Sequence, residues 1–132
     1  MFDYESFNVW AVLVAAVSSF IIGGLWYGPL LGKAWMEASG MTEEKMQQGH
    51  PGMVYGGALA LQMVAAWVIA MLAAGQGWQT GLHWGLMLGI GVAATSHGVD
   101  CLFEQKPLKL FLVNGGYKIV NYAVMGLIIG AW

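Results

Sequence analysis

Four long apolar runs alternate with short polar stretches along the chain, at residues 8–28, 53–74, 81–103 and 108–131. A helix needs roughly 20 apolar residues to cross a hydrocarbon core about 30 Å thick. Each run is long enough to do so, and only the stretch at residues 29–52 is long enough to hold structure of its own. The pattern therefore predicts an all-α polytopic membrane protein, with residues 1–132 forming a single domain of four transmembrane helices.

The polar stretch after the first run predicts a short amphipathic helix. Pro29 removes a backbone donor, so the first helix should bend or end there. Apolar residues then alternate at helical spacing with Lys33 and Glu37 as far as Gly40. This pattern is typical of a helix lying in the membrane interface. Thr42 precedes two glutamates and is a suitable cap for a further short helix ending near residue 49.

The composition supports the membrane class and excludes several others. Hydrophobic residues make up 58% of the chain and charged residues 9%, whereas soluble domains carry about a quarter charged residues. Five lysines, with no arginine, against seven acids cannot form a phosphate-binding surface, so no nucleic acid partner is expected. A single cysteine excludes a disulfide scaffold. The expected surroundings are a lipid bilayer.

The lysines outside the apolar runs predict an orientation. Lys33 and Lys45 lie between the first two runs, and Lys106 and Lys109 flank the turn between the last two. The N-terminal tail carries acids only, and residues 75–80 carry no charge. Since lysines collect on the cytoplasmic side, both termini should lie outside a bacterial inner (cytoplasmic) membrane.

Small residues recur at every fourth position within the runs. Membrane helices associate by close backbone approach, so such stripes favour packing faces, within one subunit or between subunits. Their number favours a homo-oligomer. The glycines that we assign to these faces are Gly24, Gly28, Gly81, Gly85, Gly89, Gly126 and Gly130.

Ionisable and amide side chains gather at the inner half of the last two runs. At about 100° per residue, those of the third run share one helix face, as do those of the fourth. A turn as short as residues 105–107 makes the two runs antiparallel neighbours. Gln62 of the second run should lie at a depth in the membrane similar to that of His97 and Lys118. The candidate site therefore comprises Gln62, His97, Asp100, Glu104, Asn114, Tyr117, Lys118 and Asn121.

Two interpretations of this cluster stay open. It is a site for a small solute or a proton, in which His97 titrates, Asp100 accepts and Lys118 supplies the counter-charge. Alternatively, it is a static network that only stabilises helix packing. In either case Lys118 should be paired with Asp100 or be neutral beside His97. No catalytic, metal-binding or cofactor motif is present, and Cys101 reads as a small hydrophobe, so we expect no enzyme, metal or cofactor.

Two blocks of sequence resemble a known family. Residues 11–16, 23–30 and 32–36, together with residues 102–104, 108–114 and 116–118, are similar to the DUF1761 family of small bacterial membrane proteins. The resemblance covers almost the whole chain and implies a four-span domain without an assigned activity. It also implies that many members carry histidine where this chain has Lys118, which argues against a strict histidine relay.

Overall fold

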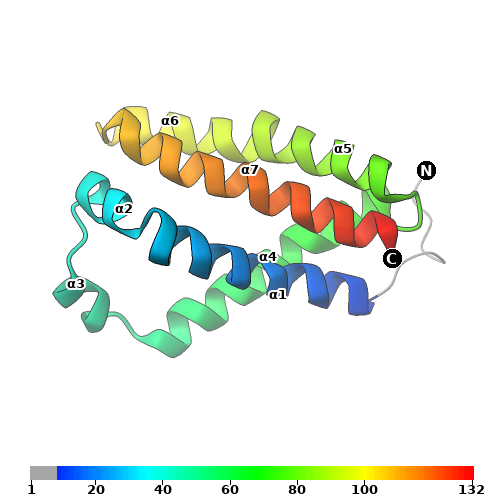
Figure 1. Cartoon of the computed structure of the whole chain (residues 1–132), viewed down its shortest axis with the longest axis horizontal. Helices are drawn as coiled ribbons and strands as arrows, with labels where there is room; N and C mark the ends of the chain where they lie inside the picture. Colours follow the sequence, from blue (N-terminus) through cyan, green and yellow to red (C-terminus); the bar gives the residue numbers. More distant parts are fainter. Residues whose placement is uncertain (1–8) are drawn as a thin grey trace.

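The structure is a computed structural model that describes residues 9–132. Within these residues the protein is all-helical and contains no strand. The expectation of four long apolar helices is confirmed, at Val9–Leu30, Gly52–Ala73, Trp78–Phe103 and Leu108–Ala131. Figure 1 shows them as an elongated bundle with the C-terminus at one end and the short helices α2 and α3 at the other.

The first long helix does not stop at Pro29. It consists of α1 (Val9–Leu25) and a π-helical turn η1 (Trp26–Leu30) that contains the proline. Proline has no N–H, and its ring clashes with the carbonyl four residues back. Each backbone hydrogen bond here therefore spans five residues, as in a π-helix, rather than the four of an α-helix. The helix breaks two residues later, at Leu31, where φ is −127°.

The short helices expected after this break are present. Helix α2 (Gly32–Ser39) ends at Gly40, whose φ of 75° requires the left-handed conformation that glycine adopts easily. Helix α3 (Glu43–Gln48) is capped as predicted, because the Lys45 N–H donates to Thr42 Oγ1 at 3.2 Å. The next helix begins directly after a turn that contains a histidine.

Helix α4 (Pro51–Ala73) begins with a histidine cap. The Nδ1 atom of His50 accepts a hydrogen bond from the Met53 N–H at 3.1 Å, and proline follows at the first helical position. The imidazole of His50 thus satisfies one of the free N–H groups in the first turn of α4. Beyond Ala74, Gly75 and Gly77 both take positive φ and turn the chain into the third long helix.

The last two long helices form an antiparallel hairpin. The first is continuous through α5 (Trp78–Leu88), the π-helical segment η2 (Gly89–Ala94) and α6 (Thr95–Phe103). After the turn, α7 (Leu108–Ala131) runs back along all three. Helix α7 also packs against α1, α2 and α4, so it is the central helix of the bundle (Figure 1).

Glycines bring α5 and α7 into backbone contact. A Cβ atom on Gly81 would overlap the backbone of Gly126, and one on Gly85 would overlap the backbone at Tyr122. The contact continues toward the C-terminus of α7, where the Gly77 N–H donates to the Gly130 carbonyl at 3.0 Å. The stripes of these two helices therefore pack against each other within one chain.

Other glycines of the proposed packing faces lie differently. A Cβ on Gly89 would lie 3.1 Å from the Ile119 Cα, so Gly89 continues the same contact. Gly24 and Gly28 are exposed, and no atom of another part of the described chain would lie within 4 Å of a Cβ there. Within residues 9–132 these two glycines join no helices, because they lie on the side of α1 and η1 that faces away from α7.

The apolar core lies toward the end of the bundle that holds the C-terminus. It is built from one end of each of three helices, where α1 begins and where α4 and α7 end. From there α4 diverges from α1 toward α3 (Figure 1). The residues exposed near the beginning of α4 include Met53, Val54 and Tyr55. The bundle is thus closed at one end and open at the other. The core residues are Ala11, Val12, Ala15, Ala66, Ile69, Ala70, Ala73, Ala74, Met125 and Ile129.

Candidate functional site

The elements that carry the flanking lysines all lie at the open end of the bundle (Figure 1). The Lys109 ammonium group donates to Glu37 Oε2 at 2.8 Å and so ties the start of α7 to α2. This hydrogen bond, together with the positive charge of Lys109, holds the pKa of the Glu37 carboxyl below its ordinary value. The grouping of lysines that the sequence predicts is therefore present, and the direction in which the bundle crosses a membrane stays a prediction.

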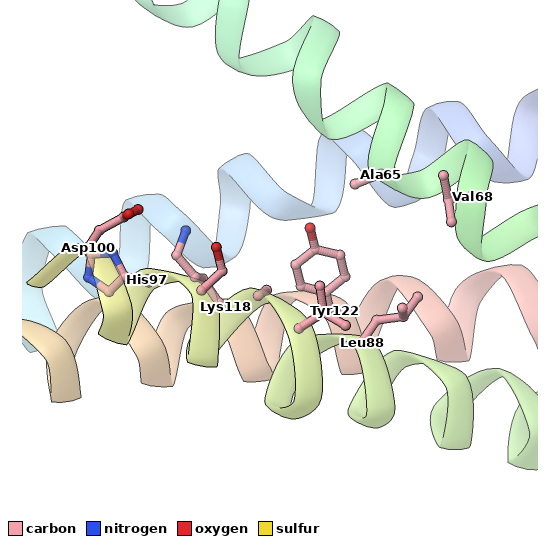
Figure 2. A pocket seen from close by; sticks show the side chains of 10 residues that line it. Ala65, Val68, Leu88, His97, Asp100, Lys118 and Tyr122 are labelled. Carbon is pink, nitrogen blue, oxygen red and sulfur yellow. The ribbon is translucent and has the colours of Figure 1, made fainter.

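A partly open pocket of about 440 Å³ lies between α4, α7 and the helix formed by α5, η2 and α6 (Figure 2). Its volume falls within the range typical of sites for small molecules. Five of its ten lining residues carry a polar or ionisable group, counting the Tyr122 hydroxyl, and the other five are apolar. The lining residues are Ala65, Val68, Leu88, Val92, Ala93, Ser96, His97, Asp100, Lys118 and Tyr122.

The pocket has a polar end and an apolar end. Asp100, His97 and Lys118 follow one another along it, and Leu88 and Val68 lie at the other end (Figure 2). The polar end is nearer the turn between α6 and α7, where the lysines lie. The ionisable side chains therefore face one common cavity.

The His97 ring is held on two sides. Its Nε2 lies 3.4 Å from Cys101 Sγ, one helical turn further on, and its plane stacks on Phe111 of α7 with centroids 6.4 Å apart and planes 18° apart. The same Phe111 ring fills the space beside Gly98, where a Cβ would come within 2.9 Å of it. The imidazole is thus fixed at the wall of the pocket, and Cys101 is buried behind it.

The expected pairing of Lys118 with Asp100 is not formed. Within residues 9–132, the structure has an ion pair between Lys109 and Glu37 and none between Lys118 and Asp100. Figure 2 shows the reason: His97 lies between Asp100 and Lys118 along the pocket. The polar end therefore offers a carboxylate and an ammonium group that are separated and face a common cavity.

Asn114 and Tyr117 do not reach this pocket, because they face α1 and η1. The Tyr27 hydroxyl donates to Asn114 Oδ1 at 2.7 Å, and the Tyr117 hydroxyl donates to the Ser19 carbonyl at 2.9 Å. The two tyrosine rings meet edge to face at 5.3 Å, and Trp26 Nε1 donates to the Val113 carbonyl at 2.9 Å. We call Trp26, Tyr27, Asn114 and Tyr117 the aromatic cluster. The polar face of α7 therefore borders the pocket on one side and α1 with η1 on the other, and Asn114 and Tyr117 lie on the second side.

Gln62 and Asn121 form a separate link between α4 and α7. Asn121 Nδ2 donates to Gln62 Oε1 at 3.2 Å, and Asn121 is only 1% exposed. Its Oδ1 is buried without a hydrogen-bond partner in the described chain. Neither residue lines the pocket, although their helices do so at Ala65 and Lys118, three residues away in each case. The prediction that Gln62, His97 and Lys118 meet is thus wrong for Gln62.

Glu104 is also outside the pocket. It is exposed at the end of α6, where its N–H donates to the Asp100 carbonyl at 2.9 Å. The helix period placed it on the face of His97 and Asp100, and it lies one turn beyond Asp100, just after α6 ends at Phe103. Within residues 9–132, no three His, Cys, Asp or Glu side chains come together as candidate metal ligands.

Sequence reasoning missed the apolar wall and the aromatic cluster. Leu88, Val92 and Ser96 are spaced four residues apart and lead to Asp100, so the helix period could have extended the polar face into an apolar one. Trp26 and Tyr27 lie at the end of the first apolar run. Their hydroxyl and indole N–H need partners when half-buried, and that requirement was the available signal.

The fold and its contacts define the class of the protein, an all-α protein with four helices long and apolar enough to cross a membrane. The chain belongs to the family described as "Protein of unknown function (DUF1761)", whose family model matches residues 10–130. The two sequence blocks that resemble this family meet in the structure, because the aromatic cluster joins Trp26 and Tyr27 to Asn114 and Tyr117. No curated protein and no solved structure matches the chain.

Proposed function

We propose that this membrane protein binds a small solute, or passes a proton, in the pocket between α4, α5–α6 and α7. The observation that supports this is the gathering of His97, Asp100 and Lys118 on one cavity among otherwise apolar helices. Ionisable groups inside a membrane are costly and mark solute and proton pathways. A static role would favour direct pairing of the two opposite charges, and they are not paired.

The proposed roles follow from the order of the groups along the pocket. Asp100 lies nearest the lysine-bearing end and accepts a proton or a cationic group from that side (Figure 2). His97 is next and exchanges a proton through its imidazole, a group suited to proton transfer. Lys118 is deepest and supplies the counter-charge. No chemical reaction is assigned to the site.

Two pocket variants with matched controls test this function. Lys118→Met and Asp100→Asn should abolish proton flux in liposomes, or solute-dependent thermal stabilisation in detergent. Lys106→Met and Glu104→Gln remove the same charges from exposed positions outside the pocket and should leave these signals unchanged. Retention of every signal by both pocket variants, with loss of folded yield only, contradicts a functional site.

The competing function is structural, with the polar side chains serving helix packing or assembly. The hydrogen bonds Tyr27–Asn114, Tyr117–Ser19 and Asn121–Gln62 favour it, because they join α7 to α1 and α4 away from the pocket. On this alternative, the pocket variants behave like substitutions in those bonds and change stability alone.

We also propose that copies of the chain associate in a bacterial inner membrane with both termini outside. The lysine-bearing end supports the orientation. The exposed Gly24 and Gly28 support association, because their stripe is left uncovered by the described chain. Gly24→Leu should then lower the mass of the particle in detergent, and an unchanged mass contradicts association through this face.

A further inference from the structure

We propose that the ligand of the pocket is a zwitterionic amphiphile, with a cationic group beside Asp100, an anionic phosphate or carboxylate beside Lys118 and His97, and an alkyl chain along the apolar wall. This inference rests on the proposed function, since it names the class of solute that the same pocket takes.

The polarity of the pocket changes along its length in the way that such a ligand requires. From Asp100 to Leu88 the wall extends over twelve residues, or about 18 Å at 1.5 Å per residue. Beyond His97 and Ser96, the lining on this helix is Ala93, Val92 and Leu88, with Ala65 and Val68 of α4 opposite. A small polar solute would leave this apolar length without a matching surface, whereas an alkyl chain fills it.

The order of charges gives the headgroup. Figure 2 shows Asp100 at one end of the polar part, His97 in the middle and Lys118 deeper. An amphiphile with an outer ammonium group and an inner phosphate, as in ethanolamine phospholipids, presents opposite charges in that same order. A purely anionic headgroup would meet Lys118 but would also meet the Asp100 carboxylate. One zwitterionic ligand compensates both unpaired groups.

The shape of the protein provides an entrance from the bilayer. Helix α4 packs on α1, α5 and α7 and makes no comparable contact with α6. On the approach to the pocket, Leu61 and Val64 of α4 are exposed, and so is Val92 on the opposite wall. An alkyl chain can therefore enter sideways between α4 and α6 while its headgroup stays near the lysine-bearing end.

The backbone of the apolar wall supports a binding role. The π-helical segment η2 (Gly89–Ala94) carries Val92 and Ala93. π-Helical turns are rare and occur frequently at functional sites, because the extra residue re-aims side chains on a continuous helix. A cavity of about 440 Å³ holds one chain rather than the two of a complete phospholipid, so a second chain would remain in the bilayer.

The inference is tested by adding lysophosphatidylethanolamine to the detergent-solubilised full chain. Thermal unfolding and native mass spectrometry measure its binding. Three probes isolate its parts: glycerophosphoethanolamine has the headgroup without the chain, lysophosphatidylglycerol has an anionic headgroup, and monoacylglycerol is uncharged. Only the zwitterionic single-chain lipid should raise the unfolding midpoint strongly and remain bound. Lys118→Met and Asp100→Asn should each weaken its affinity about tenfold or more, as expected for loss of a charge-assisted bond.

Ala93→Phe tests the apolar end separately by filling it. This variant should lose lipid binding, whereas Glu104→Gln, outside the pocket, should keep it. A nanodisc containing two-chain phosphatidylethanolamine should reproduce the stabilisation if the ligand is a bilayer lipid. If only the lysolipid acts, the ligand is a free single-chain amphiphile.

The outcomes separate this inference from the proposed function. Equal stabilisation by the headgroup alone, or by the anionic lysolipid, overturns the zwitterionic amphiphile. If no amphiphile binds while proton flux still depends on Lys118 and Asp100, the inference is wrong and the proposed function stands. If neither binding nor flux depends on these residues, both are wrong.

Discussion

The hydroxyl of Tyr27 and the amide of Asn114 form a hydrogen bond of 2.7 Å between two helices that are far apart in sequence. In a membrane, a hydrogen bond between helices contributes about 0.6–2 kcal/mol. The ring of Tyr27 also contacts Trp35 at 5.7 Å and Tyr117 at 5.3 Å. This single residue therefore connects η1, α2 and α7.

Tyr27→Phe should destabilise the protein by about 1 kcal/mol, because the ring contacts remain while Asn114 Oδ1 loses its donor. The free energy of unfolding in detergent micelles measures the effect. Tyr55→Phe is the matched control, since Tyr55 is exposed on α4. Equal stability of the two variants would contradict a stabilising role for the Tyr27–Asn114 bond.

The sequence predicted part of the site residue by residue. His97, Asp100 and Lys118 could be brought to one pocket because the helix period and the short turn fix their relative faces. Asn114 and Tyr117 could not be placed, because their partners belong to α1 and η1, and the period of one hairpin carries no information on which helix covers its edge.

At the scale of elements, the contact between α5 and α7 depends on the absence of side chains. Gly85→Ala places a methyl group against the Tyr122 backbone, which cannot move as a flexible side chain would. We expect a destabilisation of about 1–3 kcal/mol, typical of overpacking. Gly57→Ala on α4, where the space is open, should be neutral or stabilise slightly through its higher helix propensity. Unfolding of both variants in detergent measures the difference, and a tolerated Gly85→Ala would contradict the close contact.

The tie between α2 and α7 depends on pH through Glu37. Its pKa is lowered in the folded protein, first by the hydrogen bond from Lys109 and then by that residue's charge. The bond therefore contributes stability above the ordinary pKa of a glutamate, and this contribution is lost as the pH falls through the lowered pKa. The exposed position makes the contribution small.

Titration of the Glu37 carboxyl by NMR should show a lowered pKa that returns toward its ordinary value in Lys109→Met. Lys106→Met is the control, because Lys106 makes no ion pair in the described chain. The same Glu37 pKa in all three proteins would show that the Lys109–Glu37 bond does not form in solution.

The long helices could be predicted because their apolar length alone decides them, whereas the π-helical segments could not. An insertion of one residue into the hydrogen-bond ladder leaves composition and hydropathy unchanged. Pro29 gave a local signal for η1, although it predicted a bend or an end of the helix rather than a wider turn. The residues of η2 gave none, since Gly89–Ala94 reads as ordinary small-residue helix.

At the scale of the whole molecule, a closed end and an open end divide the bundle. Ile69, Met125 and Ile129 are fully buried where α4 and α7 end together. Toward the lysines, α4 diverges and the helices enclose a pocket rather than a core (Figure 1). The direction of this divergence could not be predicted from sequence, because apolar residues that face lipid and apolar residues that face a core look alike.

Thiol labelling measures the hydrated pocket most directly. In a Cys101→Ala background, Ser96→Cys and Lys118→Cys place a thiol on the pocket wall, while Val99→Cys and Val120→Cys place one on exposed helix positions that do not line it. A cysteine thiol ionises only where water reaches it, and its thiolate then attacks the sulfur of a small, charged methanethiosulfonate reagent, with methanesulfinate as the leaving group. It should modify both pocket cysteines and leave residues 99 and 120 unmodified in a bilayer. Equal protection of all four positions, or labelling at 96 without 118, would show that Lys118 and the face of His97 share no hydrated space.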